Sequence, residues 1–168
     1  MGADAFDVLG IDASFDLDRE ALRRAWLRRS LDAHPDRAGG DDAARELAAR
    51  LNDAKRVLED DESRADALLV RLGGPAREAE KSLPDGFLME IMELREELEL
   101  AQGAGDPAAL APHRERAERE RRARLERVRA MFSGNIDDST LRDIRVELNA
   151  WRYLERMLGQ IDPSADVL

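Results

Sequence analysis

Apolar side chains recur every three or four positions along most of the chain, and this spacing predicts a protein built from α-helices. In the first half it predicts a short helical segment at residues 6–11 and helices at 18–33, 43–59 and 60–72. Gly73, Gly74 and Pro75 then interrupt the pattern, because glycine and proline together favour a turn. We therefore expect residues 1–74 to form one domain of about four helices, with a linker at 75–82.

Three longer helices are predicted in the second half, at about residues 84–101, 107–132 and 138–159. Asp106 and Pro107 suit the N-cap and the first turn of the middle helix. Short connections between long helices favour an antiparallel bundle. We expect residues 83–168 to form a three-helix domain, so that the whole fold is all-α.

The helix predicted at 84–101 carries apolar residues on two opposite faces. At about 100° per residue, one stripe is the natural core face, and it consists of Phe87, Ile91, Leu94 and Leu98. On roughly the other side are three more apolar residues with two carboxylates beside them, namely Leu88, Met89, Met92, Glu93 and Glu96. Exposed apolar residues ringed by carboxylates are typical of a protein-docking patch.

The last predicted helix is also apolar on two sides. One stripe consists of Leu141, Ile144, Leu148, Trp151 and Leu158. The other, nearly opposite, consists of Val146, Ala150, Tyr153 and Met157. Periodicity leaves two interpretations open for the second stripes of both helices: they bind another protein, or they pack on the first domain or on a second copy of the chain.

Composition excludes several classes of function. The net charge of −10 disfavours a general nucleic-acid binder, whose phosphate contacts need a basic surface. The absence of cysteine excludes disulfides, thiolate metal sites and a cysteine nucleophile. No apolar run is long enough to span a bilayer, and the first residues do not resemble a signal peptide. We expect a cytoplasmic protein without a cofactor or a metal.

Two segments reverse the overall charge locally. Residues 19–31 contain five arginines and one glutamate, a local charge of +4. Residues 113–131 contain eight arginines and four glutamates. Because stacking aromatics are missing from the second segment and its glutamates oppose phosphate, we interpret it as a salt-bridged solvent face. The first segment is either a solvated helix face or a basic docking surface.

The tripeptide His34-Pro35-Asp36 follows the first arginine-rich helix. Pro35 ends that helix near residue 33 and places His34 and Asp36 on a turn. An enzyme using His34 as base and Asp36 as its orienter is one interpretation, although no serine, lysine or phosphate loop nearby completes a catalytic site. An ordinary helix-terminating turn is another.

A helix, an HPD turn and a second helix near the N-terminus resemble the J domain, which stimulates DnaK-class ATP-driven chaperones. Residues 6–10 (FDVLG), 22–26 and 52–58 also resemble segments of that family, over about residues 4–72. The resemblance implies that the HPD turn, together with Arg23, Arg24 and Arg28, contacts the chaperone. Leu27, Asp32 and Ala33 depart from the family pattern, since basic residues are usual at the first two positions and an aromatic at the third.

The second half resembles the C-terminal domain of the HscB family, the J-type co-chaperones of iron–sulfur cluster assembly. The resemblance rests on residues 84–98 (PDGFLMEIMELREEL), 128–132 and 151–154. It implies that the bundle binds the scaffold protein IscU and brings it to the chaperone HscA. It also implies the scaffold-contact positions, which are Leu88, Met89, Met92, Glu93, Glu96 and Tyr153.

The sequence thus predicts a two-domain co-chaperone that is not an enzyme. It would stimulate a DnaK-class, HscA-type ATPase and deliver an IscU-type client. Three alternatives remain: a J protein with a different client, a structural helical adaptor that contacts no chaperone, and an enzyme that uses His34 and Asp36.

Overall fold

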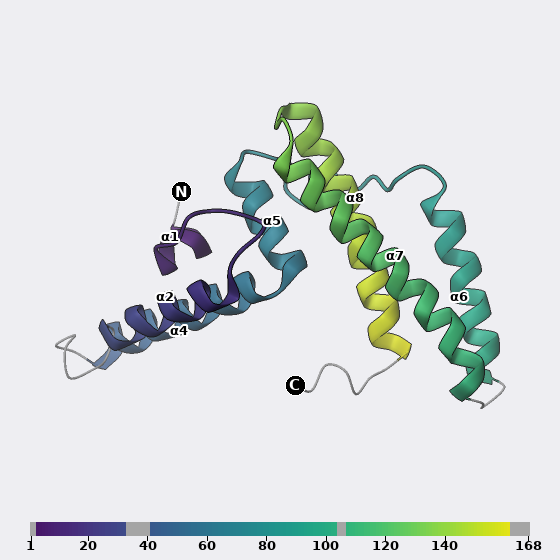
Figure 1. Ribbon diagram of the computed structural model, residues 1–168, viewed down its shortest axis with the longest axis horizontal. Helices are drawn as coiled ribbons and strands as arrows, with labels where there is room; N and C mark the ends of the chain where they lie inside the picture. Colours follow the sequence, from purple (N-terminus) through teal and green to yellow (C-terminus); the bar gives the residue numbers. More distant parts are fainter. Residues whose placement is uncertain (1–2, 33–40, 104–106, 162–168) are drawn as a thin grey trace. The chain divides into compact units, whose positions relative to one another are not determined.

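All regular structure in the described part of the chain is helical. The computed structural model describes residues 3–32, 41–103 and 107–161, and it divides into two compact units, 1–73 and 74–168 (Figure 1). The first unit contains α1 (Ala5–Leu9), α2 (Arg19–Asp32), α4 (Asp41–Glu59) and α5 (Asp61–Arg71). The second contains α6 (Phe87–Gly103), α7 (Pro107–Ser133) and α8 (Asp138–Ile161). The prediction of an all-α fold is confirmed.

Local capping explains where several of these helices begin and end. Asp18 accepts the backbone N–H of Glu20 at 2.9 Å and so caps α2. Asp60 caps α5 through the N–H of Ser63. Gly10 ends α1 with a positive φ of 64°, a backbone conformation that glycine adopts without steric cost.

In the first unit α2 and α4 lie side by side, and α1 and α5 pack against α4 (Figure 1). The Trp26 Nε1–H of α2 donates to Asn52 Oδ1 of α4 at 3.0 Å, and the ammonium of Lys55 lies over the indole ring. The apolar residues of α4 at spacings of three and four are only partly buried. Leu51, Ala54 and Leu58 are in the core, but Leu47 is 40% exposed.

Arg64 is a buried cation that the hydrophobic pattern did not reveal. Its Nε donates to the Phe15 carbonyl at 2.8 Å, its Nη1 donates to the Leu58 carbonyl at 2.7 Å, and its Nη2 pairs with Asp61. The guanidinium also lies over the Phe15 ring. One buried side chain thereby ties the connector before α2 to α4 and α5, since its charge is compensated on several sides.

The pKa of Asp4 leads to a pH-dependent prediction for the first unit. Burial of the Asp4 carboxyl acts to raise its pKa, but the Asp7 N–H and the paired Arg71 guanidinium outweigh this effect and hold the pKa below its usual value. A lowered folded-state pKa stabilises the fold above the unfolded-state pKa, and this contribution is lost as pH falls through the folded value. Asn retains the capping ability of Asp, so Asp4→Asn should remove mainly the charge contribution.

We expect Asp4→Asn to lower the unfolding midpoint at neutral pH and to have a smaller effect as the pH falls below about 4. Trp26 fluorescence in a Trp151→Phe background reports on the first unit, because the other tryptophan is then absent. Asp12→Asn, at an exposed position of the same unit, is the matched control. An effect of Asp4→Asn that does not change with pH would contradict the assignment.

The second unit explains why α8 is apolar on two sides. Ala150, Leu154 and Met157 are buried in one core cluster with Phe87, Ile91, Leu94, Leu98 and Ala117. Two of the four residues of the second predicted stripe of α8, Ala150 and Met157, therefore lie in the core of the unit, whereas Val146 is half-buried and Tyr153 is exposed. Four residues of the other stripe are buried as well, namely Leu141, Ile144, Leu148 and Trp151, and α7 lies alongside both α6 and α8 (Figure 1).

Candidate functional site

The first two turns of α6 carry three exposed apolar side chains on their outward face. Leu88 is 51%, Met89 70% and Met92 57% exposed, whereas Phe87, Ile91, Leu94 and Leu98 on the inward face are buried. We call Leu88, Met89 and Met92 the α6 stripe. Glu93 and Glu96 are exposed on the same helix. An uncovered group of large apolar residues is the usual mark of a binding surface.

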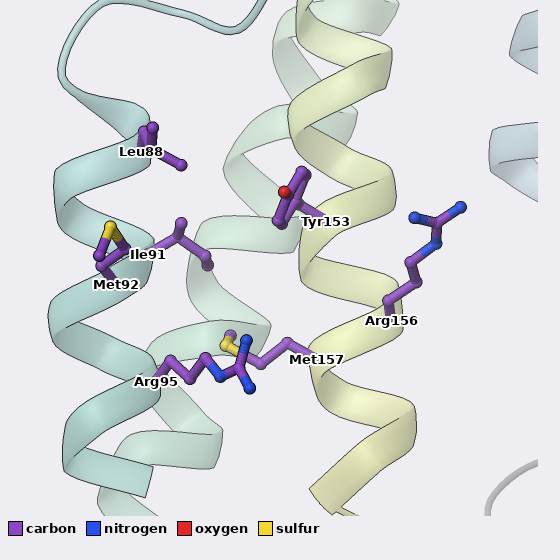
Figure 2. A pocket seen from close by; sticks show the side chains of 7 residues that line it. All are labelled: Leu88, Ile91, Met92, Arg95, Tyr153, Arg156 and Met157. Atoms are coloured by element: carbon purple, nitrogen blue, oxygen red, sulfur yellow. The ribbon is translucent and has the colours of Figure 1, made fainter. Parts of the chain in front are cut away.

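A hollow of about 400 Å³ lies beside the α6 stripe, between α6 and α8 (Figure 2). From α6 it is lined by Leu88, Ile91, Met92 and Arg95, and from α8 by Tyr153, Arg156 and Met157. Arg95 reaches across towards Met157, whereas Arg156 extends along α8 and away from α6. We call this the α6–α8 hollow. Its floor is apolar, and its charged groups lie at the rim.

Tyr153 is the α8 residue that joins this surface. It is 45% exposed, and its ring meets that of Phe87 edge to face, with 6.3 Å between the centroids. Phe87 is itself buried at the first turn of α6, so Tyr153 is held from below by the core. The structure thus brings Tyr153 next to Leu88 and Met92 although they are far apart in sequence.

A buried ion pair supports the core under this surface. Arg124 of α7 and Glu147 of α8 are 4% and 9% exposed, and Arg124 Nη1 donates to Glu147 Oε2 at 2.7 Å. The Arg124 guanidinium also lies over the Phe87 ring, 4.9 Å from its centroid. Arg124 is therefore an exception to the predicted solvent face of α7. In the sequence, nothing distinguishes Arg124 from the neighbouring arginines of α7, so its burial could not be predicted.

Other charges of α7 behave as predicted and lie on the surface of the bundle. Arg119 pairs with Glu115 and Arg129 with Glu126 along the helix. Arg116 pairs with Glu97 of α6 at 3.1 Å, and Arg121 with Glu155 of α8 at 3.3 Å. These pairs satisfy the arginines within the bundle, as expected for a solvated face.

The basic surface predicted in the first unit lies on α2. Arg23, Arg24 and Arg28 are all exposed on this helix. Arg24 approaches the Asp18 carboxylate to 3.5 Å. Leu27, at one of the positions that depart from the J-domain pattern, is exposed among these arginines. His34, Pro35 and Asp36 lie outside the described residues, so their role remains a prediction from the sequence.

Three further residues beside the stripe were missed by the sequence analysis, namely Lys81, Arg95 and Arg156. Arg95 follows Met92 by three positions and Arg156 follows Tyr153 by three. That spacing places the two residues of each pair on one helix face. It is the sequence feature from which Arg95 and Arg156 could have been predicted to lie at this surface. Lys81 precedes α6, and no helical spacing relates it to the stripe.

The described ranges hold no group of three or more acidic or histidine side chains arranged to bind a metal ion. None of their helices is long and apolar enough to cross a membrane.

Comparisons with known proteins match both halves of the chain. Residues 4–66 match the DnaJ domain model, and residues 83–162 match the model of the HSCB C-terminal oligomerisation domain. The chain is 33% identical to the co-chaperone protein HscB homolog of Burkholderia multivorans over 97% of its own length and 94% of the relative. It is also 33% identical to the HscB homolog of Bordetella parapertussis, over 96% and 95%.

Two solved structures share the fold. The chaperone HscB from Vibrio cholerae matches with a TM-score of 0.77 and 26% identity, covering 97% of this chain and 98% of that one. The human co-chaperone protein HscB matches with a TM-score of 0.80, covering 98% and 83%, and at 22% identity it supports the fold alone.

Proposed function

This chain belongs to the HscB family of co-chaperones, and from this premise we propose that it couples an iron–sulfur scaffold protein to a chaperone ATPase. Its first unit stimulates a DnaK-class chaperone of the HscA type. Its second unit binds a scaffold of the IscU type and delivers it to that chaperone. The chain itself holds no cofactor and performs no covalent step, and both partners are met in the cytoplasm.

The exposed α6 stripe is the observation that carries this proposal. Leu88, Met89 and Met92 remain in water although α6 buries a complete apolar face elsewhere. A helix that serves only to complete a bundle gains nothing from a second apolar face, and such a face is an aggregation risk. Tyr153 extends this surface across the α6–α8 hollow (Figure 2), and a tyrosine at a rim is a frequent anchor of protein interfaces.

The basic face of α2 supports the chaperone end of the proposal. Arg23, Arg24 and Arg28 lie exposed on one helix of a chain with a net charge of −10. Such a local cationic surface steers encounter with an acidic partner and sets its orientation. The exposed Leu27 among these arginines adds an apolar contact at a position where the J-domain pattern has a basic residue.

The test is chaperone ATPase turnover measured with this protein, with the scaffold protein, and with both together. We expect the two proteins together to stimulate turnover by more than the product of their separate effects, because the scaffold arrives already held beside the ATPase. Equal stimulation with and without the scaffold would leave a J protein with a different client. No stimulation in any combination would favour the structural adaptor.

Replacing His34 by glutamine is expected to return ATPase turnover to the basal rate of the chaperone. The reason is that the proposal assigns contact with the chaperone to the HPD turn, whereas client binding is assigned to α6 and α8. Titration calorimetry with the scaffold and the circular dichroism spectrum should both be unchanged. A His34→Gln protein that still stimulates the chaperone would contradict this assignment.

A second copy of the chain is the competing occupant of the α6 stripe, since the matched family model is described as an oligomerisation domain. Sedimentation of the wild-type protein and of Met92→Asp separates the two. A dimer that dissociates on substitution, with scaffold binding unchanged, would assign the stripe to self-association. A monomer in both cases leaves the client as its occupant.

A further inference from the structure

A second hollow borders the α6 stripe on its other flank. It measures about 550 Å³, and its lining includes Lys81, Leu83, Pro84 and Asp85 from the segment before α6. We call it the linker hollow. Leu88 and Met92 line both this hollow and the α6–α8 hollow. These two side chains therefore form a ridge with a concavity on each side.

The wall of the linker hollow is fixed to the bundle by hydrogen bonds. Asn149 Nδ2 of α8 donates to the carbonyls of Glu80 at 3.1 Å and Ser82 at 3.0 Å. Arg145 Nε donates to the Pro75 carbonyl at 2.9 Å, and Leu83 packs against the core cluster of α6 and α8. Segment 75–83 is thus held in place as part of the second unit.

The charged side chains that line the two hollows are mostly cations, although Glu93 and Glu96 are exposed on α6. The linings contain three cations, Lys81, Arg95 and Arg156, and one carboxylate, Asp85, in a protein with a net charge of −10. Arg95 shares its charge with Glu99, to which its Nε donates at 2.8 Å. Lys81 and Arg156 form no ion pair with any residue in the described ranges. An occupant with carboxylates would complement these cations.

Resting on the proposed function, we infer that the scaffold client straddles the Leu88–Met92 ridge. Apolar side chains of one client surface enter both hollows, and carboxylates beside them pair with Lys81 on one flank and with Arg156 and Arg95 on the other. The client-binding surface therefore extends to segment 81–85, beyond the residues of α6 and Tyr153. It recognises an acidic, apolar surface of the client.

The exposure of the ridge supports this two-sided arrangement. Leu88 and Met92 are each about half exposed. Because each side chain lines two hollows, filling only one hollow would leave the other side of the side chain in contact with water. Contacts at an interface contribute most of their affinity when surrounding groups exclude water from them. A client that enters one hollow alone would leave the ridge partly hydrated.

The inference is tested with the full-length charge-reversal variants Lys81→Glu and Arg156→Glu. The probe is the scaffold protein without its cluster, and the readout is its dissociation constant at low and high salt. We expect each variant to weaken binding by about 3- to 10-fold at low salt and by less at high salt, because exposed charge pairs are screened. Circular dichroism should show the wild-type helix content, since both side chains are exposed.

Arg122→Glu is the matched control, because it makes the same charge change at an exposed position of α7 that lines neither hollow. We expect it to shift affinity by less than about twofold. Lys81→Glu and Arg156→Glu proteins that bind like this control, or more tightly than wild type, would overturn the inference. If the inference is overturned, the double variant Leu88→Asp/Met92→Asp shows whether the proposed function fails too. If the double variant abolishes scaffold binding, only the two-sided arrangement is wrong. If it does not, the proposed function of the α6 stripe is wrong as well.

Discussion

Replacing Leu88 and Met92 together by aspartate is expected to weaken scaffold binding by at least about 100-fold. Both side chains are large, half exposed and placed at the centre of the proposed surface. The substitution removes two apolar contacts and places two carboxylates where the client would have to desolvate them, a cost of several kcal/mol. Titration calorimetry with the purified scaffold measures the loss.

Leu100→Asp is the control for this pair. Leu100 is also on α6 and is 77% exposed, but it lines neither hollow. Changing it tests whether any aspartate in place of an exposed apolar residue of α6 weakens binding. We expect its affinity to stay within about twofold of wild type. Near-normal binding by Leu88→Asp/Met92→Asp would remove the α6 stripe from the client-binding surface.

Glu147→Ala is expected to destabilise the second unit by about 3–5 kcal/mol. The substitution leaves the Arg124 guanidinium inside the bundle without its carboxylate partner, and Arg127 loses a contact of 3.6 Å to the same group. An uncompensated buried charge is among the most costly changes in a protein interior. Urea unfolding followed by Trp151 fluorescence, in a Trp26→Phe background, measures the loss.

The matched variants separate the cost of an unpaired charge from the loss of a favourable interaction. Arg124→Met/Glu147→Leu replaces both partners by apolar groups and should be close to wild type in stability. The reason is that the attraction within a buried ion pair is often little larger than the cost of removing both charges from water. Arg119→Ala removes the exposed pair with Glu115 and should cost less than about 0.5 kcal/mol. A Glu147→Ala protein as stable as Arg119→Ala would show that water or another group compensates Arg124.

The two predictions concern one connected part of the molecule. Phe87 contacts Tyr153 on one side and lies under the Arg124 guanidinium on the other, so the buried pair supports the floor beneath the client-binding surface. A Glu147→Ala protein that is destabilised but still folded is a useful comparison variant in the scaffold-binding assay. Its affinity for the scaffold should fall less than that of Leu88→Asp/Met92→Asp, because its α6 stripe keeps its own side chains.

The sequence by itself determined the helices, their caps and the faces on which apolar residues gather. Asp18 and Gly10 act within a few residues of their own positions, and the stripe of Phe87, Ile91, Leu94 and Leu98 follows from the helical repeat. These features are local, so a pattern along the chain is sufficient to predict them. The family resemblance likewise rests on short segments that can be compared directly.

Only the tertiary structure decided which apolar faces are covered. Two helices had two apolar stripes each in the sequence, yet Ala150 and Met157 of the second stripe of α8 are buried in the core of the unit, whereas the second stripe of α6 remains exposed. Leu47 of α4 is 40% exposed for the same reason. Periodicity identifies the apolar face of a helix but not how far along that face a neighbouring helix reaches. Burial depends on the neighbours of a side chain, and these come from distant parts of the sequence.

The burial of the α7 arginines was also decided by the tertiary structure and not by the sequence pattern. Residues 113–131 gave no sign that Arg124 is buried while Arg119 and Arg122 are exposed, because the difference is made by Glu147 and Phe87 on other helices. The two hollows likewise need segment 81–86, α6 and α8 together. Helical spacing is set by the backbone of one segment, whereas the environment of a charge or a cavity is set by the packing of several.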